Sequence, residues 1–335
     1  MIRRFTVILL AGLVTATAAS AQTKLNGAGA TFPYPMYSKW FSEYNKLHPD
    51  VQINYQSIGS GGGIRQVAAG TVDFGATDGP MTDQQLADAK SKIHHIPTVL
   101  GAVVPAYNIK GLSGEMRFTG LLLAEIFLGR IANWNDPKIA KENPGINLPN
   151  TPIVVVHRSD GSGTTFVWTD YLSKISPEWQ SNVGKGNSVR WPKGLGAKGN
   201  EGVAGMIRQM DGAIGYIELI YAEQNKIPYG TVKNAAGEYV KATLDSVTKA
   251  AATAKMPNDF RVSITNAPGK GVYPVASFTW LLVPEQNADA NKQRILKDFL
   301  NWMVTDGQKL TSQLTYAPLP AEVATRVKTT ISQLK

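Results

Sequence analysis

The segment IVVVHRSDGSGTTFVWTDYLSKI, residues 153–175, joins an apolar stretch to a helical stretch through a loop of glycines and hydroxyl groups. Residues 153–158 have the continuous apolar character of a buried strand, and residues 163–175 have the pattern of a helix. A strand that leads directly into a helix is the repeating unit of α/β folds, which bind ligands beyond the carboxyl ends of their strands. The connecting loop, RSDGSGTT, is therefore the first candidate for a binding site.

The same alternation continues along the chain and predicts an α/β architecture with largely parallel sheets. Thr82 and Gln85 have the spacing of a capping box at the start of a helix. Residues 249–255, rich in alanine, are interpreted as a surface helix. The other predicted elements are strands at 51–59, 72–78 and 212–218, a strand pair within 95–109, and helices at 34–47, 121–134 and 293–310.

The first 21 residues have the pattern of a secretory signal peptide. Arg3 and Arg4 precede an apolar run, and Ala19-Ser20-Ala21 has the small residues of a cleavage site. We therefore expect export to the periplasm, with cleavage after Ala21. The chain contains no cysteine, so we expect no lipid anchor, no disulfides and no thiolate metal site. No later segment has the length of a transmembrane helix.

The length and the net charge of the chain limit the number of domains and the kinds of molecule that the protein could bind. Removal of the signal peptide from 335 residues leaves 335 − 21 = 314, which is enough for two domains. The formal net charge of +9 falls to +7 when Arg3 and Arg4 are lost. A basic protein can attract nucleic acid, an anionic surface or a small anion. No basic run is interleaved with aromatic residues, so we expect no nucleic-acid partner.

The loop RSDGSGTT lacks the features of a nucleotide site or a serine hydrolase. A phosphate-binding P-loop requires a Gly-Lys-Ser/Thr ending, and this loop has no lysine. A nucleophile elbow requires glycine two residues before the serine, where this chain has Asp160 before Ser162. The four histidines stand in no recognisable catalytic or metal-binding pattern. We therefore predict neither catalysis nor a cofactor or metal.

The loop does have what a small anion needs. Gly161 to Thr164 stand at a helix start, where backbone N–H groups lack partners and the helix dipole favours negative charge. Arg158 adds a forked cation that fits a tetrahedral oxyanion, and Asp160 could hold it in place. Alternatively, Asp160 caps the helix and the glycines only form a turn. This loop by itself leaves the two interpretations open.

Two other segments favour the anion site. Ser60, in SIGSGGGIR, lies between a predicted strand and a predicted helix. Thr31 and Phe32, in TKLNGAGATFP, directly precede the helix predicted at 34–47. Three glycine-rich helix starts of this kind predict one site at which the loops converge.

These segments resemble those of the phosphate-binding proteins of bacterial ABC phosphate importers, the PstS family. The similar blocks are GAGATFPYPMYSKW, IGSGGGIRQVAAGTVDFGATDGP, EIFLGRIANWND, RSDGSGTTFVWTDYL, GLGAKGNEGVAG and GAIGYIE. The resemblance covers nearly the whole chain after the signal peptide. It implies a periplasmic-binding-protein fold of two α/β domains, joined by a two-crossing hinge, with the ligand in the cleft. It also implies a monomer that delivers inorganic phosphate to a membrane permease and performs no chemistry.

The glycine-rich segments KGLSG and NAPGKGV, placed after and before apolar strands, predict the domain boundaries, and the resemblance assigns site residues. Domain I would comprise residues 22–109 and 272–335, and domain II residues 110–271. Asp78 would accept a proton from the ligand, and Asp160 would orient Arg158. Another oxyanion, such as arsenate or phosphite, and a secreted phosphatase-like relative remain alternatives. The phosphate-binding residues implied are Thr31, Phe32, Ser60, Asp78, Arg158, Ser162, Gly163 and Thr164.

Overall fold

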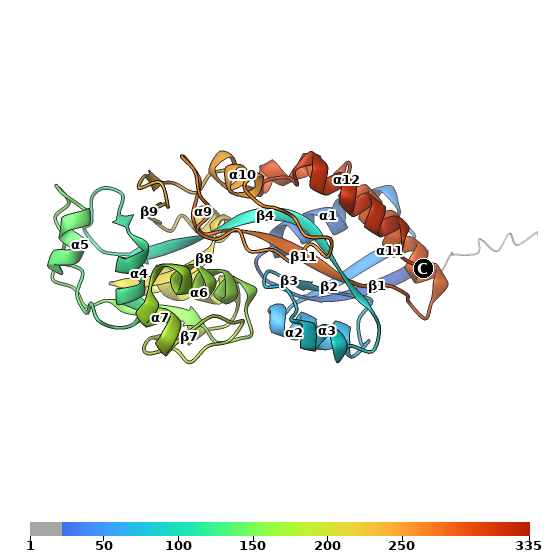
Figure 1. The fold of residues 1–335 in the computed structure, drawn as a ribbon, viewed down its shortest axis with the longest axis horizontal. Helices are drawn as coiled ribbons and strands as arrows, with labels where there is room; N and C mark the ends of the chain where they lie inside the picture. The colour runs from blue at the N-terminus through green and yellow to red at the C-terminus, as the bar shows by residue number, and fades with distance from the viewer. Residues whose placement is uncertain (1–21) are drawn as a thin grey trace, which may run out of the picture.

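The computed structural model describes residues 22–335, and its centre is one curled sheet of eight strands (Figure 1). The order along the sheet is β2-β1-β3-β11-β4-β8-β6-β7. The predicted signal peptide lies outside the described residues. The strands are β1 (Thr23–Gly29), β2 (Val51–Ser57), β3 (Phe74–Thr77), β4 (Ile93–Asn108), β6 (Val154–Arg158), β7 (Leu195–Ala197), β8 (Ala213–Glu218) and β11 (Ala276–Pro284). A second sheet contains β5 (Arg117–Phe118), β9 (Thr231–Lys233) and β10 (Tyr239–Val240).

The central strand β4 connects the two halves of the molecule. The sequence predicted a pair of strands within 95–109, but β4 is a single strand of 16 residues. Nearly all of it is buried, so its apolar run continues without the polar turn that a hairpin needs. Its residues up to Ala102 pair with β11, and its residues from Val103 pair with β8. Each half of the sheet therefore takes part of its hydrogen bonding from the same strand.

The sheet is mixed rather than largely parallel as predicted. β1 pairs in parallel with β2 and β3, and β6 pairs in parallel with β7 and β8. The pairs at the centre, β3 with β11, β11 with β4 and β4 with β8, are antiparallel. Of the two central strands, β4 pairs with strands of both halves, whereas β11 pairs only with β3 and with β4 up to Ala102. Local alternation of strands and helices could not reveal this, because the pairing joins segments more than 100 residues apart.

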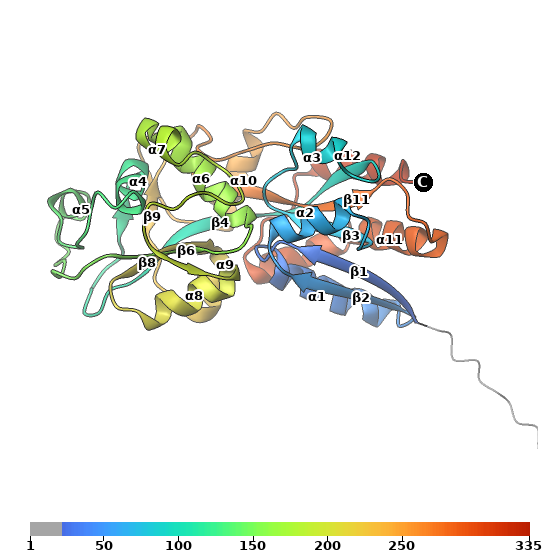
Figure 2. The same cartoon turned by 90° about the horizontal axis from the view of Figure 1, so that it is seen from below.

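Helices cover both sides of each half. In one half, α2 and α3 lie on one side of the strands and α1, α11 and α12 on the other (Figure 1). In the other half, α6 and α7 lie opposite α8 and α9 (Figure 2). The helices are α1 (Tyr34–Leu47), α2 (Ser60–Ala68), α3 (Asp83–Ala87), α4 (Gly120–Phe127), α5 (Pro137–Glu142), α6 (Gly163–Ile175), α7 (Pro177–Asn182), α8 (Gly199–Gln209), α9 (Leu219–Asn225), α10 (Leu244–Ala252), α11 (Ala290–Met303) and α12 (Ala321–Ser332), with a 3₁₀ helix, η1, at Gly307–Leu314.

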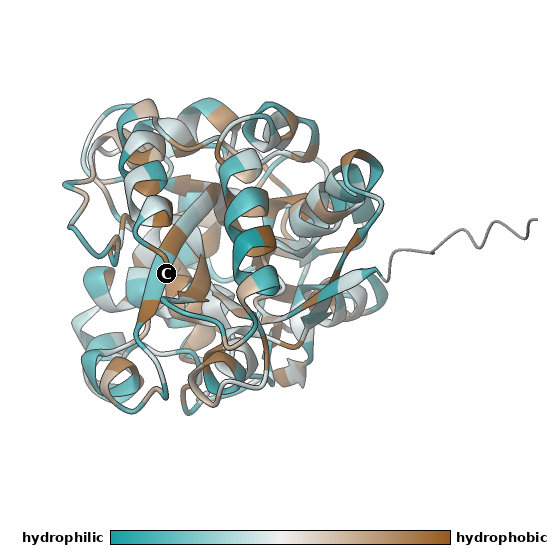
Figure 3. Cartoon of the chain, turned by 90° about the vertical axis from the view of Figure 1, so that its right-hand side faces the viewer, coloured by the Kyte–Doolittle hydropathy of each residue, from teal (hydrophilic) through white to brown (hydrophobic). Residues whose placement is uncertain are grey.

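Apolar residues, brown in Figure 3, gather on the central strands and recur at intervals along the helices. Their main cluster runs through both halves of the molecule, from Leu25 in β1 to Leu334 after α12. Trp40, Trp134 and Trp280 are among its fully buried members. Within residues 22–335, no helix is long and apolar enough to cross a lipid bilayer.

Several helix boundaries follow from local chemistry. Thr82 and Gln85 form the predicted capping box at the start of α3. The helix predicted at 121–134 ends at Phe127, because Gly129 adopts a left-handed φ of 77° that breaks the helix. The helix predicted at 293–310 is likewise divided into α11 and η1. At the first residue of η1, the carbonyl of Gly307 accepts a hydrogen bond from the Trp40 indole at 2.8 Å.

The alanine-rich patch is not wholly a surface helix as predicted. Only its first part belongs to α10, which ends at Ala252, and Ala250 and Ala251 are buried. Both alanines belong to the main core cluster. A small side chain lets this helix approach the sheet closely, so alanine content alone does not indicate exposure.

We expect Gly63→Ala, in α2, to lower the free energy of unfolding by about 1–3 kcal/mol through overpacking. An added Cβ would lie 2.6 Å from the carbonyl oxygen of Ala28 and 2.7 Å from that of Ala76, both in strands. The matched control is Gly205→Ala in α8, where a Cβ meets nothing within 4 Å. That change should raise stability by about 0.5–1 kcal/mol. Urea unfolding measures both values, and equal effects would contradict the packing of α2.

Candidate anion-binding site

Three helix starts meet where the two halves of the molecule touch. Thr31 and Phe32 precede α1, Ser60 begins α2, and Ser162 caps α6. The loops are held together directly: the N–H of Gly61 donates to the carbonyl of Gly161 at 2.8 Å. The three glycine-rich segments that the sequence singled out thus converge on one place.

Glycine is required at these contacts because the loop backbones meet without room for side chains. Gly59 has a left-handed φ of 88° and faces the carboxylate of Asp160. A Cβ at Gly163 would lie 2.5 Å from Asp78 Oδ2 and 2.5 Å from Ser60 Oγ. The glycines therefore allow the two loops to pack directly against each other. This is a structural requirement, and it distinguishes these segments from flexible linkers rich in glycine.

All the residues predicted for the site lie in this region, and nearly all are fully buried. Asp160 is the most exposed, with a side-chain accessibility of 11%. The ring of Phe32 belongs to the hydrophobic core, so only its backbone can face the site. Its carbonyl accepts a hydrogen bond from the hydroxyl of Tyr316. The buried members are Thr31, Phe32, Ser60, Asp78, Arg158, Ser162, Gly163 and Thr164.

Arg158 and Asp160 form a two-point ion pair. Arg158 donates from Nε to Asp160 Oδ1 at 2.7 Å and from Nη2 to Oδ2 at 2.5 Å. The backbone N–H of Gly199 also donates to Asp160 Oδ1. Burial raises the pKa of Asp160, but these hydrogen bonds and the charge of Arg158 outweigh it and hold the pKa below its usual value. The guanidinium is therefore fixed in place and keeps its Nη1 for other contacts.

The alternative that Asp160 caps the helix is wrong. The N-cap of α6 is Ser162, whose hydroxyl oxygen accepts from the N–H of Thr165 at 3.0 Å. α6 begins at Gly163, so Thr165 is helical, as predicted. Two polar residues near the helix start could each have served as the cap. Asp160 does not, because Arg158 and Gly199 occupy its carboxylate.

Ser60 joins the two halves and presents a donor. Its Oγ accepts the N–H of Gly163 at 3.0 Å and the N–H of Asp78 at 3.2 Å. A hydroxyl has two lone pairs and one hydrogen, so both acceptor positions of Ser60 are occupied. Its hydrogen is left for an acceptor, either the carboxylate of Asp78, whose pKa Ser60 lowers, or an oxygen of a ligand. The N–H of Gly163, by contrast, is already bonded to Ser60.

Asp78 supplies the opposite function, an acceptor. Its Oδ1 accepts from the hydroxyl of Thr279 at 2.8 Å. Its buried Oδ2 has no hydrogen-bond partner in the part of the chain that the structure describes. Burial raises the pKa of Asp78 to about 7, although Thr279, Arg158 and the hydroxyl of Ser60 oppose that shift. A buried carboxylate oxygen without a partner is costly, so a ligand that donates a hydrogen would satisfy it.

This arrangement combines a fixed cation, several hydroxyl donors and one acceptor in a closed space. Such a set matches an oxyanion that carries several acceptor oxygens and one O–H. No group of three His, Asp or Glu side chains within residues 22–335 is placed to hold a metal ion.

Sequence reasoning missed three residues that contact this site. Asn200, in the quoted block GLGAKGNEGVAG, donates from Nδ2 to Thr31 Oγ1 at 2.7 Å. The hydroxyl of Tyr221 donates to the carbonyl of Thr31, and Thr279 bonds Asp78. A fourth glycine-rich helix start was a signal for Asn200. Tyr221 and Thr279 had none, because only the folded chain brings them near.

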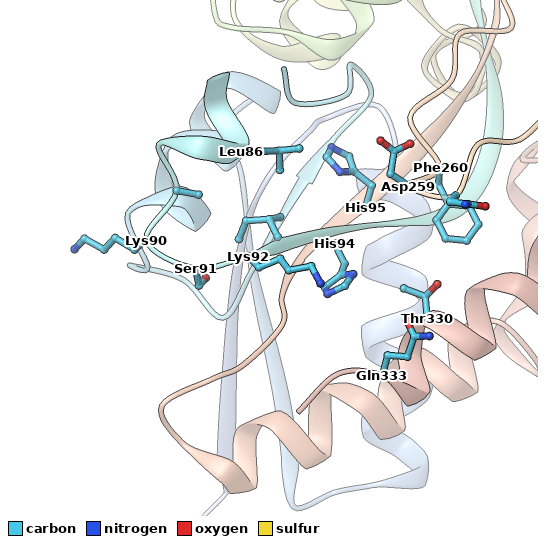
Figure 4. Close-up of a pocket in the computed structure, with 13 residues that line it drawn as sticks. Leu86, Lys90, Ser91, Lys92, His94, His95, Asp259, Phe260, Thr330 and Gln333 are labelled. Carbon is cyan, nitrogen blue, oxygen red and sulfur yellow. The ribbon is translucent and has the colours of Figure 1, made fainter. Parts of the chain in front are cut away.

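A separate open cavity of about 620 Å³ lies away from these loops (Figure 4). Leu86, His94, His95 and Phe260 are part of its lining, and the predicted site residues are not. The ring Nε2 of His95 accepts from the N–H of Met81, and burial lowers the pKa of this histidine to about 3. His95 is therefore neutral and holds the turn before α3.

Comparison with known proteins identifies the family. The model of the PBP superfamily domain matches residues 14–307. A protein of Xylella fastidiosa named phosphate-binding protein PstS is 47% identical over 308 residues, 91% of this chain and 84% of that protein. A protein of the same name from Pasteurella multocida is 43% identical over 325 residues, 96% of this chain and 94% of that protein. This chain belongs to the PstS family.

PstS membership confirms the resemblance seen in the sequence blocks. A solved structure of a periplasmic phosphate-binding protein, PfluDING with bound phosphate, superimposes with a TM-score of 0.74 at 22% identity. The match covers 92% of this chain and 93% of that one, and at this identity it shows the fold alone. The predicted α/β periplasmic-binding-protein fold is therefore confirmed.

The raised pKa of Asp78 predicts a pH dependence of stability. The folded protein holds this proton more tightly than the unfolded chain, so stability is retained below pH 4 and falls as the pH rises from about 4 to 7. Asp78→Asn cannot ionise, so it should escape this loss. Relative to the parent, the ligand-free variant should gain on the order of 3 kcal/mol in unfolding free energy between pH 4 and pH 8. Urea unfolding at the two pH values measures this, and a constant difference would contradict the burial of Asp78.

Proposed function

We propose that this protein captures inorganic phosphate outside the cytoplasm and delivers it to an ABC-type phosphate import permease. The main support for this function is that the site combines hydrogen-bond donors with a buried acceptor, Asp78 Oδ2, that has no partner among the described residues. Arg158 and Ser60 offer N–H and O–H groups, while Asp78 Oδ2 requires a hydrogen. Phosphate at neutral pH has oxygens for the donors and at least one O–H for the acceptor. The residues proposed to bind it are Thr31, Phe32, Ser60, Asp78, Arg158, Ser162, Gly163 and Thr164.

The same pairing would exclude sulfate. Sulfate carries no proton at neutral pH, so its oxygen would meet the carboxylate of Asp78 as acceptor against acceptor. Like charges in contact within a desolvated site cost several kcal/mol. A penalty of about 4 kcal/mol corresponds to roughly a thousandfold difference in affinity. Arsenate has the shape and the protons of phosphate, so this site would accept it as well.

We propose two domains that close on the ligand by a hinge. Domain I comprises residues 22–109 and 272–335, and domain II residues 110–271. The strand order supports this division, since β11 lies beside β3 and β4 although residues 110–271 separate it from them. β4 changes its pairing partner at Ala102–Val103, so the first crossing of the hinge would lie within β4, a few residues before the proposed boundary at residue 109.

The proposal also covers the location of the protein, its oligomeric state and its partner. The expected signal peptide would bring the protein to the periplasm, where it would act as a monomer and dock transiently on its permease. It would perform no catalysis. The names of the relatives from Xylella fastidiosa and Pasteurella multocida support a role in binding rather than in chemistry.

Calorimetric titration of the protein without its signal peptide, with phosphate and with sulfate, tests the function. We expect phosphate to bind and sulfate to bind about a thousandfold more weakly or not at all. Asp78→Asn should lose much of this preference, because its amide can donate to sulfate as well as accept from phosphate. A protein that binds neither anion would overturn the proposal. An unchanged ratio of the two affinities in the variant would remove Asp78 from the selectivity.

If the cleft closes at Gly163, a side chain at this position should weaken phosphate binding. Gly163→Ala would place a methyl group 2.5 Å from Asp78 Oδ2 and Ser60 Oγ. The start of α6 would then have to move away from Ser60 and Asp78, which would open the cleft. We expect phosphate affinity to fall about 10- to 100-fold, as overpacking costs of 1–3 kcal/mol imply. Gly202→Ala in α8 is the control, because its Cβ would have only ordinary contacts at 3.5 Å with Ala197. Titration of both variants with phosphate measures the difference, and equal affinities would argue against closure at Gly163.

A further inference from the structure

Asn200, at the start of α8, has a fully buried side chain with every polar atom bonded inside the site. Its Oδ1 accepts from the N–H of Glu218 at 2.9 Å. Because an N–H can only donate, this bond identifies Oδ1 and leaves Nδ2 facing the other way. Nδ2 donates to Thr31 Oγ1 at 2.7 Å and to Thr164 Oγ1 at 3.0 Å. One amide thus contacts two of the predicted binding hydroxyls.

The contacts of Thr31 determine the direction of its hydroxyl hydrogen. Its Oγ1 accepts both from Nδ2 of Asn200 and from the backbone N–H of Asn200, the latter at 3.2 Å. These two bonds occupy both lone pairs, so the hydroxyl can act only as a donor. The carbonyl of Thr31 accepts from Tyr221, which holds the residue in place from the same half of the molecule as Asn200.

Thr164 is constrained in the same way from the other side. Its Oγ1 accepts from Nδ2 of Asn200 at 3.0 Å and from Nη1 of Arg158 at 3.4 Å. Its hydrogen is likewise left to donate. Hydroxyls that were free to rotate could accept from the protein or from a protonated ligand equally well. Here both are held as donors before the ligand arrives, which is the preorganisation that anion binding favours.

We infer that Asn200 is a positioning residue of the phosphate site, which fixes Thr31 and Thr164 as donors and links the two halves of the molecule. Thr31 precedes α1, whereas Asn200 and Thr164 begin α8 and α6. The bonds to Thr31 therefore cross the boundary between the proposed domains. Asn200 contributes to affinity without any need to touch the ligand, and this role rests on the function proposed above.

The matched pair for the test is Asn200→Ala and Asn234→Ala. Asn234 is also buried and bonded at both ends, to the carbonyls of Gly269 and Val272 and to the N–H groups of Ala236 and Glu238. Both variants should lose stability, but only Asn200→Ala should lose phosphate affinity, by about 10- to 100-fold, as expected for donors to a charged ligand. Equal affinities of the two variants would overturn the inference.

Asn200→Asp removes the two donors of the side chain but keeps its size. The carboxylate has the shape of the amide but can only accept, so Thr31 and Thr164 would turn their hydrogens toward it. We expect this variant to bind phosphate at least as weakly as Asn200→Ala. Both the loss of the two donors and the added negative charge should weaken phosphate binding, so affinity near that of the parent would overturn the inference.

A double-mutant cycle with Thr31→Val completes the test. If Asn200 acts partly through the Thr31 hydroxyl, Asn200→Ala should weaken binding at least threefold less in the Thr31→Val background than in the parent. Fully multiplicative effects would contradict that coupling. The parent protein is titrated first: if it does not bind phosphate, the proposed function fails and this inference with it. If it binds and Asn200→Ala binds equally well, the inference alone fails.

Discussion

Direct contact of backbone with backbone at the junction of the two halves is the constraint on which the site depends. The N–H of Gly61 bonds the carbonyl of Gly161, and the N–H of Gly163 bonds the hydroxyl of Ser60. Any side chain at Gly163 would hold the loops apart. Because the loops meet so closely, the groups behind them are shut off from water and their hydrogen bonds and charges act at full strength. The burial of Asp78 and Arg158 is a consequence of this contact.

Burial makes the balance of charge in the site critical. Arg158 carries a fixed positive charge, and Asp160 offsets it through two hydrogen bonds. Asp78 has no such cation bonded to it, and burial accordingly raises its pKa to about 7. The site thus contains one strongly paired carboxylate and one that is only partly satisfied. In the function proposed above, a protonated oxyanion would balance the charge of Arg158 and supply the missing hydrogen bond of Asp78.

The two halves are joined by more than the contact at the glycines. Strand β4 supplies hydrogen bonds to β11 with one end and to β8 with the other. The segment around residues 256–265 forms a second connection. Arg326 of α12 donates to the carbonyls of Met256 and Pro257, whereas Ser263 and Thr265 donate to Asp170 of α6. α6 also carries Gly163 and Thr164 at its start, so this second connection joins α12 to the helix that begins at the site.

The sequence by itself determined the local structure and the chemistry of the loops. The alternating apolar segments predicted most strands, the Thr82–Gln85 spacing predicted a helix start, and three glycine-rich segments predicted a convergent anion site. These features depend on neighbours a few residues away, which is why they could be predicted. The family blocks extended this to the predicted binding residues, Asp78 and Arg158 among them.

Only the tertiary structure decided the features that depend on distant partners. β4 is one strand because β11 and β8 both pair with it. Ser162 rather than Asp160 caps α6, because Gly199 and Arg158 donate hydrogen bonds to the carboxylate of Asp160. Asn200 acquires its role through Thr31, which lies 169 residues away in the chain. The direction of a hydroxyl hydrogen depends on which lone pairs are occupied. Those contacts exist only when the chain has closed on itself, so no local pattern of residues could contain them.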